Sequence, residues 1–363
     1  MRIREGPTEL LVPEEHSAGG PGKINGSVFF NEQMAFNRDV SVMFLRAFDM
    51  DMYVADAMTA TGSRAVRIAN EVPRTTVTAN DISAYAIPYI EENIRLNGLT
   101  NCVPSNRNLH VLFAEQVFDY IDIDPFGSPV PFLHSAIQGC RRHGILAITA
   151  TDTAPLAGAH RVKCERRYQC RPLRGPMCHE AGLRILVGTM AREMAKFDKG
   201  IDPMLSFSSD HYYRTYIKAM DGAGHADESL SKLVYLAFDP DTLERSYSYE
   251  PDKEHIYGPF WGGRLFDKDH IAKMIPSGTA VEKRCTKMLG LWRAEMDDIP
   301  LMYEMSEFSS HLRIATPPFD EFMETMNDYG RTTPTHISPT AFKTELSVKE
   351  ICDVFAEVSG RHT

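Results

Sequence analysis

Hydrophobic and polar positions follow two alternating periods along the first 150 residues. Short apolar runs with the length of buried strands recur, and most are followed by apolar residues spaced three and four apart, as on one face of a helix. The predicted strands are 52–57, 75–80, 102–107, 118–123 and 144–149. Strands and helices in this order predict an α/β fold, in which a doubly wound, Rossmann-like parallel sheet is covered by helices.

Residues that end helices and further periodic apolar segments extend this prediction. Pro73 is expected to end the helix that begins after Gly62, and Gly98 to end the helix after the second strand. The helix after the fourth strand is predicted to carry on one face Phe132, Leu133, Ala136, Ile137 and Cys140. A long core helix is predicted further on, with one apolar stripe formed by Leu183, Leu186, Val187, Met190 and Met194. Segments 204–220 and 232–238 look strand-like and are expected to extend the sheet in antiparallel fashion.

The last hundred residues have a different pattern. Short amphipathic helices are predicted around 305–312 and 319–326, followed by a turn at Gly330, and Ser347 with Glu350 has the form of a capping box that opens a final helix. Two short helices, a hairpin and a closing helix suggest a winged helix-turn-helix. We therefore predict two domains, residues 1–265 and a smaller α+β domain of residues 266–363. Such a module binds nucleic acid or serves in packing and dimerisation.

Composition excludes several classes of protein. With 43% hydrophobic and 24% charged residues, the chain has a globular composition, and no apolar run is long enough for a membrane helix or a signal peptide. We therefore expect a cytoplasmic protein. Its seven cysteines are scattered and form no CxxC pair, so neither disulfides nor a metal site is expected. Cys164, Cys170, Cys178 and His179 lie near each other in sequence, but their spacing fits no zinc pattern.

Charge is unevenly distributed. The net charge of -10 argues against a polyanionic partner, yet the segment 160–174 carries six basic side chains and one acidic residue, Glu165. The six are Arg161, Lys163, Arg166, Arg167, Arg171 and Arg174. A basic segment in an acidic chain is typical of local contact with nucleic acid, and a solvated loop with fortuitous charge is the alternative.

Candidate chemistry lies where predicted parallel strands end, because ligands of open α/β sheets bind at that edge. The first strand leads through Gly62 into a helix without the G-x-G-x-x-G pattern that a dinucleotide pyrophosphate requires, which favours another cofactor. Asp81 follows the second strand, where a carboxylate can accept hydrogen bonds from ribose hydroxyls. The alternative for Asp81 is a helix N-cap.

The third strand end is Asp124-Pro125-Phe126-Gly127. Exocyclic amines of bases are poor nucleophiles, so an acceptor must take the proton as a group is transferred to them. Asp124 and the Pro125 carbonyl can supply acceptors, and Phe126 can stack on a flipped base, although Pro and Gly here could also mark a simple turn. Asp122 points to the same face of the strand and is expected to order the structure beneath Asp124.

Asp124-Pro125-Phe126-Gly127 resembles the (Asp/Asn)-Pro-Pro-(Tyr/Phe) motif of amino-group methyltransferases. Nearly the whole chain resembles the tRNA (guanine-26 N2)-dimethyltransferase family of archaea and eukaryotes. Supporting stretches are Val28–Asn31, Phe36–Asp39, Ala60–Ala65, Ala79–Ser83, Thr149–Leu156, Cys178–Arg184, Ser209–Tyr212, Gly258–Gly262 and Thr335–His336. The resemblance implies that tRNA is the partner and that methyl groups pass from S-adenosyl-L-methionine to N2 of guanine 26, giving mono- and then dimethylguanosine.

The resemblance also implies roles for individual residues. Cofactor binding would fall to Arg38, Arg64, Asp81, Ile82, Asn108 and Leu109, with the two arginines on the methionine carboxylate and Asn108 and Leu109 near the adenine. Asp124 would be the catalytic acceptor, and Phe29 and Phe126 would sandwich the guanine. Where the family usually has an acidic residue near the adenine, this chain has Asn108. Many members also have paired cysteines for zinc, but residues 179–284 contain no cysteine, so zinc is not expected.

Three other functions remain open from the sequence. Another nucleic-acid amine, such as an rRNA guanine N2 or adenine N6, could be the target, because the motif is shared. A non-catalytic RNA-binding protein could have kept the same fold. An NAD-dependent oxidoreductase is disfavoured by the single glycine at residue 62.

Overall fold

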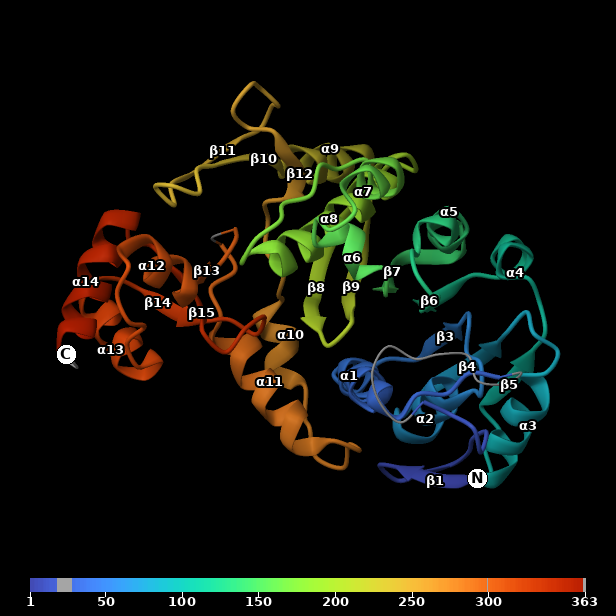
Figure 1. Ribbon diagram of the computed structural model, residues 1–363. Helices are drawn as coiled ribbons and strands as arrows, with labels where there is room; N and C mark the ends of the chain where they lie inside the picture. Colours follow the sequence, from blue (N-terminus) through green and yellow to red (C-terminus); the bar gives the residue numbers. More distant parts are fainter. Residues whose placement is uncertain (18–27, 299, 362–363) are drawn as a thin grey trace.

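The structure is a computed structural model that describes residues 1–17, 28–298 and 300–361 (Figure 1). Its centre is a seven-stranded sheet of order β5-β4-β3-β6-β7-β9-β8, in which the first five strands are parallel and β9 is antiparallel to both of its neighbours, β7 and β8. The strands are β3 (Met52–Asp56), β4 (Thr75–Asn80), β5 (Cys102–Ser105), β6 (Phe118–Ile123), β7 (Cys140–Ala150), β8 (Lys199–Ser209) and β9 (Tyr212–Asp221). The predicted doubly wound α/β fold is confirmed.

Helices cover both faces of this sheet (Figure 1). One face carries α1 (Ala35–Arg46), α2 (Ser63–Glu71) and α3 (Ile87–Leu96), and the other carries α4 (Leu109–Glu115), α5 (Val130–Gly139) and α8 (Cys178–Ala195). Helix α2 ends where predicted, because Val72 precedes a proline and takes the extended conformation, with φ -109° and ψ 113°. Gly98 follows α3 with φ +61°. The prediction that Cys140 lies on a helix is wrong, since β7 begins there.

The prediction that residues 232–238 extend the main sheet is also wrong. After β9, helix α9 (Ala223–Ser231) packs against β8 and carries the chain to a separate three-stranded sheet. Its order is β11-β10-β12, with β10 (Leu233–Phe238), β11 (Arg245–Ser248) and β12 (Tyr257–Trp261). Strand β12 packs on α8, so the apolar residues of this sheet are buried there.

Short elements surround the carboxyl edge of the main sheet. At the N-terminus β1 (Arg2–Glu5) and β2 (Thr8–Leu11) form a hairpin, and the 3₁₀ helix η1 (Glu32–Met34) precedes α1. Helices α6 (Thr153–Leu156) and α7 (Arg161–Tyr168) follow β7. No helix in the described part of the chain is long and apolar enough to cross a membrane.

The C-terminal elements include the predicted helix pair, hairpin and closing helix. They are α10 (Lys268–Lys273), α11 (Glu282–Ala294), β13 (Tyr303–Glu304), α12 (Met305–Leu312), α13 (Phe319–Tyr329), β14 (Thr332–Pro334), β15 (Ala341–Thr344) and α14 (Val348–Gly360). The strands form a sheet of order β13-β15-β14, and Ser347 with Glu350 makes the predicted capping box of α14. This order of elements is typical of a winged helix-turn-helix.

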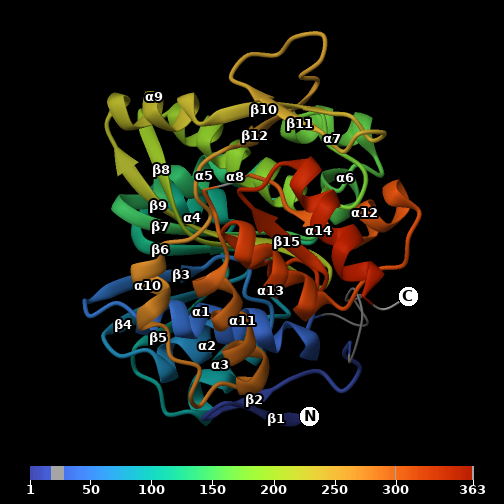
Figure 2. The same cartoon turned by 90° about the vertical axis from the view of Figure 1, so that its left-hand side faces the viewer.

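The described residues form two main hydrophobic cores. The larger includes Ile271 of α10 and Trp292 of α11, and the smaller gathers Phe308, Phe322 and Phe355 from α12, α13 and α14. Figure 2 shows α10 and α11 in front of α1, and backbone N–H groups at the start of α11 donate to Asp39 of α1 at 2.8 and 3.0 Å. The domain boundary near residue 265 stays a prediction. The larger core is formed mainly by residues up to Met302 and the smaller core mainly by residues from Met305 onward, so a boundary drawn between the two cores would fall near residue 303.

Candidate active site

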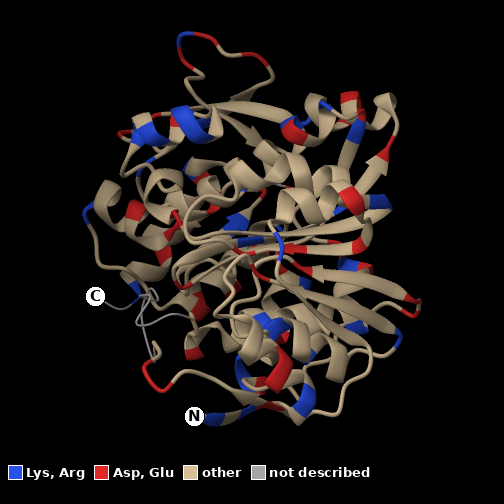
Figure 3. Ribbon diagram, turned by 90° about the vertical axis from the view of Figure 1, so that its right-hand side faces the viewer, with Lys and Arg blue, Asp and Glu red and all other residues tan. Residues whose placement is uncertain are grey.

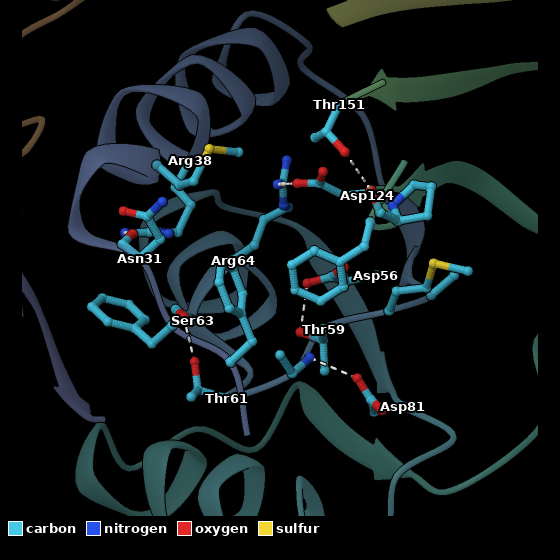
Figure 4. A pocket seen from close by; sticks show the side chains of 18 of the residues that line it. Asn31, Arg38, Asp56, Thr59, Thr61, Ser63, Arg64, Asp81, Asp124 and Thr151 are labelled. Atoms are coloured by element: carbon cyan, nitrogen blue, oxygen red, sulfur yellow. Dashed lines mark hydrogen bonds and ion pairs between the residues drawn. The ribbon is translucent and has the colours of Figure 1, made fainter. Parts of the chain in front are cut away.

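The carboxyl ends of β3, β4 and β6 border a cavity of about 540 Å³ (Figure 4). All nine residues to which the family resemblance gave a role line it, together with others such as Asp56, Met58, Phe132 and Thr151. Its volume lies in the range of sites for small-molecule ligands, roughly 300 to 1,000 Å³. The sheet edge therefore brings distant parts of the sequence into one place.

The turn after β3 positions one end of the cavity. Gly62 takes φ +80°, and a Cβ there would come within 3.2 Å of the Ile90 side chain, so the tight approach of α2 to α3 needs glycine. Asp81 at the end of β4 accepts hydrogen bonds from the Ala60 and Ser83 N–H groups, each at 2.8 Å. Since α3 begins at Ile87, Asp81 is not its N-cap, and that alternative is excluded.

Asp124 lies at the other end, beside β6 (Figure 4). Its carboxylate makes an ion pair with Arg64 of α2, whose guanidinium also donates to Asp122 at 3.2 Å. Asp122 is fully buried; burial raises its pKa, but Arg214 and Arg64 outweigh this, so its pKa lies below the ordinary value. The structure thus supports the prediction that Asp122 is a buried support beneath Asp124.

Asp56 at the end of β3 is a further carboxylate of the cavity. Its side chain accepts a hydrogen bond from the Thr59 hydroxyl at 2.5 Å. Burial raises the pKa of Asp56 to about 7, with the Arg64 charge opposing and the nearby Asp122 and Asp124 adding to the rise. This group therefore carries a proton over part of the physiological pH range.

The loop after Asp124 is fixed to the end of β7. The Gly127 N–H donates to the Thr151 hydroxyl at 2.6 Å, and the Thr151 N–H donates to the Gly127 carbonyl at 3.0 Å. Gly127 takes φ +93°, which favours glycine. Both the Asp124 side chain and the Pro125 residue line the cavity, so the two acceptors expected from the sequence lie together.

Phe29 and Phe126 contact each other directly. Their ring centroids are 4.7 Å apart with an interplanar angle of 82°, which is an edge-to-face arrangement. Two rings that hold a base between them must lie parallel and about 7 Å apart, twice the normal carbon contact of about 3.5 Å. The two aromatics therefore lie next to each other, but to form a sandwich one ring must turn and also move away from the other. Phe126 is 59% exposed and has room to do so.

Arg38 reaches the cavity from α1 with most of its guanidinium already bound. Its Nε and Nη2 donate to the two carboxylate oxygens of Glu5 at 2.8 and 2.5 Å, and Nη2 also donates to the Asn31 carbonyl at 3.1 Å. The guanidinium carbon lies 4.9 Å from the Phe30 ring centroid. The N-terminal hairpin thus fixes Arg38 through Glu5.

The remaining predicted cofactor residues form an apolar end of the cavity. Ile82 is 71% exposed at the rim, whereas Leu109 is buried at the start of α4. The Asn108 side chain caps α4 by accepting a hydrogen bond from the His110 N–H at 2.9 Å. One oxygen lone pair of Asn108 and its amide N–H groups are left for a ligand.

Sequence reasoning assigned no role to several residues that the structure places at or behind the cavity. Thr151, Asp210, His211 and Tyr212 line it. Glu5 holds Arg38, which also lines it, and Arg214 holds Asp122 behind it. Thr151 and the segment 209–212 lie in stretches that carried the family resemblance, which was the available signal. Glu5 and Arg214 gave no local signal, because each partner is distant in sequence.

Comparisons with known proteins identify the family of the chain. The family model of N2,N2-dimethylguanosine tRNA methyltransferase matches residues 9–356. The tRNA (guanine(26)-N(2))-dimethyltransferase of Pyrococcus horikoshii is 38% identical over 99% of this chain and 98% of its own length. The enzyme of that name from Saccharolobus islandicus is 33% identical over 96% of this chain and 97% of its own. The chain belongs to the N2,N2-dimethylguanosine tRNA methyltransferase family.

A solved structure agrees with this assignment. The structure of Trm1 from Pyrococcus horikoshii in complex with S-adenosyl-L-methionine has a TM-score of 0.90 and 37% identity, over 98% of this chain and 99% of its own. The family and enzyme class predicted from the sequence are confirmed.

Within the described residues, no group of three or more His, Cys, Asp and Glu side chains is placed to hold a metal ion.

Proposed function

We propose that this chain methylates the exocyclic N2 of guanine 26 in tRNA, once and then a second time, with S-adenosyl-L-methionine as the donor. The observation that carries the proposal is the full-length relation to enzymes of that name, combined with a cavity that gathers the predicted residues. The same relation favours this function over methylation of another amine and over non-catalytic RNA binding. We place the enzyme in the cytoplasm, where tRNA is available.

The chemistry of the cavity fits the cofactor. Asp81 offers a carboxylate for ribose hydroxyls, Leu109 and Ile82 offer apolar surface for an adenine, and Arg38 and Arg64 offer cationic groups for a carboxylate. When bound, S-adenosyl-L-methionine supplies an electrophilic methyl group on a sulfonium sulfur. The missing pyrophosphate explains why a single glycine suffices in the turn before α2.

Asp124 acts as the acceptor in the transfer. Guanine N2 forms a bond to the methyl carbon, the carbon–sulfur bond breaks with its electron pair on sulfur, and the N2 proton passes to the Asp124 carboxylate. The Pro125 carbonyl accepts a hydrogen bond from the amino group and orients it. Phe126 stacks on the flipped base, with Phe29 on the other side after one ring has turned.

The segment 160–174 supplies a surface for tRNA phosphates beside the cavity. Figure 3 shows Lys and Arg gathered at the upper left, where α7 lies. Arg167 donates to Asp152, next to Thr151, at 2.9 Å and so ties this segment to the site. Lys163, Arg166 and Arg174 have no acidic partner within the described chain and are left for phosphate contacts.

The test is incubation of the protein with labelled S-adenosyl-L-methionine and tRNA transcripts, followed by mass spectrometry of the nucleosides. We expect N2-methyl- and N2,N2-dimethylguanosine, both lost when guanine 26 is replaced by adenine. Incorporation that persists after this replacement would refute the assigned position. Modified adenine in the digest would refute the assigned base.

A further inference from the structure

Arg214 is an arginine that lies behind the cavity and is fully buried. It comes from β9, an antiparallel strand next to β7, and its guanidinium is sealed from solvent. Nη1 donates to Asp122 Oδ1 at 2.9 Å and to the Thr149 hydroxyl at 2.7 Å, while Nη2 donates to Asp122 Oδ2 at 2.5 Å. This is a two-pronged clamp on a single carboxylate, which fixes both position and orientation.

Asp122 is shared between two arginines. Besides the two bonds from Arg214, its Oδ2 accepts from Arg64 Nη1 at 3.2 Å and from the Tyr120 hydroxyl at 2.9 Å. The other terminal nitrogen of Arg64 makes the ion pair with Asp124. A continuous series of contacts therefore runs from Arg214 through Asp122 and Arg64 to the proposed acceptor.

The charges of this series balance. Two guanidiniums face two carboxylates where the side chains of Arg214 and Asp122 are fully buried and those of Arg64 and Asp124 are 8% and 16% exposed. If Arg214 is removed, Asp122 keeps one cation, and a buried charge with an incomplete set of partners draws that cation closer. Arg64 would then move toward Asp122 and away from Asp124 and the cavity.

We propose that Arg214 is a positioning residue of the methyl transfer: by neutralising Asp122, it leaves Arg64 available to Asp124 and to the cofactor. This rests on the proposed function of the cavity. Arg214 touches neither substrate nor cofactor and acts only through Asp122 and Arg64. Because Arg214 lies on β9, a residue of the antiparallel part of the sheet influences Asp124 at the end of the parallel strand β6.

Several charged groups lie around Asp124. Arg64 comes from α2, Asp56 from β3 and Asp122 from β6, while Asp81, Asp210 and His211 line the cavity from the β4 end and the β8–β9 turn. Loss of the Arg64 contact leaves Asp124 without the cation that holds it in place. The rate of methyl transfer should then fall.

The test compares R214K with R184K in the full-length protein. Arg184 of α8 is a matched control, because it is also fully buried and ion-paired with a buried carboxylate, Glu180, at 2.8 Å. Lysine keeps the charge but loses the clamp at each site. The measurements are kcat, the KM for S-adenosyl-L-methionine, and the melting temperature.

For R214K we expect kcat to fall at least about tenfold and the KM for S-adenosyl-L-methionine to rise, because Arg64 then leaves Asp124 and the cofactor site. R184K should lower the melting temperature and leave kcat and KM in place. A more severe variant, R214M, should enlarge both effects; if it does not fold, R214K alone decides. Unchanged kcat and KM in R214K would overturn the proposal and leave Arg214 a structural residue. A wild-type protein without methyl transfer would instead refute the proposed function.

Discussion

Replacement of Asp124 by asparagine tests the proposed acceptor directly. D124N keeps the shape of the side chain and removes the negative charge that takes the guanine proton. General-base catalysis contributes about 10²- to 10⁴-fold, so kcat should fall by that factor, equivalent to about 2.7 to 5.4 kcal/mol in the activation barrier. Arg64 keeps Asp122, Asn37 and Ser41 as partners, so the free energy of unfolding should fall by only about 1 to 3 kcal/mol, the cost of one lost partner of a buried donor.

The assay for D124N is single-turnover methylation of a tRNA transcript, with cofactor affinity measured separately by calorimetry. Cofactor binding should be retained, because Asp124 lies at the opposite end of the cavity from Asp81 (Figure 4). The control is D122N, the same change two residues earlier. Since Asp122 is fully buried between two arginines, D122N should destabilise the fold by about 3 to 5 kcal/mol. A D124N protein with wild-type kcat would refute the assignment of the acceptor.

Three further changes test other parts of the site. F126A should lower kcat/KM for tRNA by about tenfold through lost stacking, worth about 1 to 3 kcal/mol, with cofactor affinity unchanged in calorimetry. Replacing Lys163, Arg166 and Arg174 by alanine should weaken tRNA binding and reduce the slope of log K against log salt by roughly 0.7 to 0.9 per lost phosphate contact, measured by filter binding; an unchanged slope would exclude this surface. Because the folded pKa of Asp56 is about 7 against an ordinary 3.8, this group destabilises the fold progressively as pH rises from about 4 to about 7. D56N should remove that loss in urea titrations across this range, and an unaltered pH dependence would contradict it.

The parts of the fold that could be predicted are those with local causes. Strand β4 and the ends of α2 and α3 follow from apolar runs and from Pro73 and Gly98, whose effects act within a few residues. The placement of residues 232–238 could not be predicted in this way. An apolar run indicates that a strand is buried but does not indicate which strand it pairs with. Residues 232–238 pair outside the main sheet because α9 leads the chain away from it.

The same distinction holds in the site. Asp81 and Asp124 were found because each follows directly on a strand, and a strand end is a local feature. The contacts that orient the arginines join distant segments, Glu5 with Arg38 and Asp122 with Arg64, the latter 58 residues apart. No spacing rule links such pairs, so only the packed structure shows that both arginines facing the cavity are themselves held by buried carboxylates.

Buried charge also holds the C-terminal sheet against the rest of the molecule. Glu180 of α8 accepts hydrogen bonds from Lys343 of β15 at 2.7 Å and from Arg184 at 2.8 Å. Burial raises the pKa of Glu180, but these two cations outweigh burial and lower the pKa to about 2. His336 donates from Nδ1 to Glu295 at 2.7 Å and accepts from the Ser208 N–H at 3.2 Å. Two carboxylates, Glu180 and Glu295, thus meet two cations, Arg184 and Lys343, across α8, the end of α11 and β15. Loss of one member would leave a buried charge unpaired, which destabilises the fold strongly. Because apolar packing carries no such penalty for a small shift, the cluster fixes the position of β15 relative to α8 more strictly than apolar packing alone.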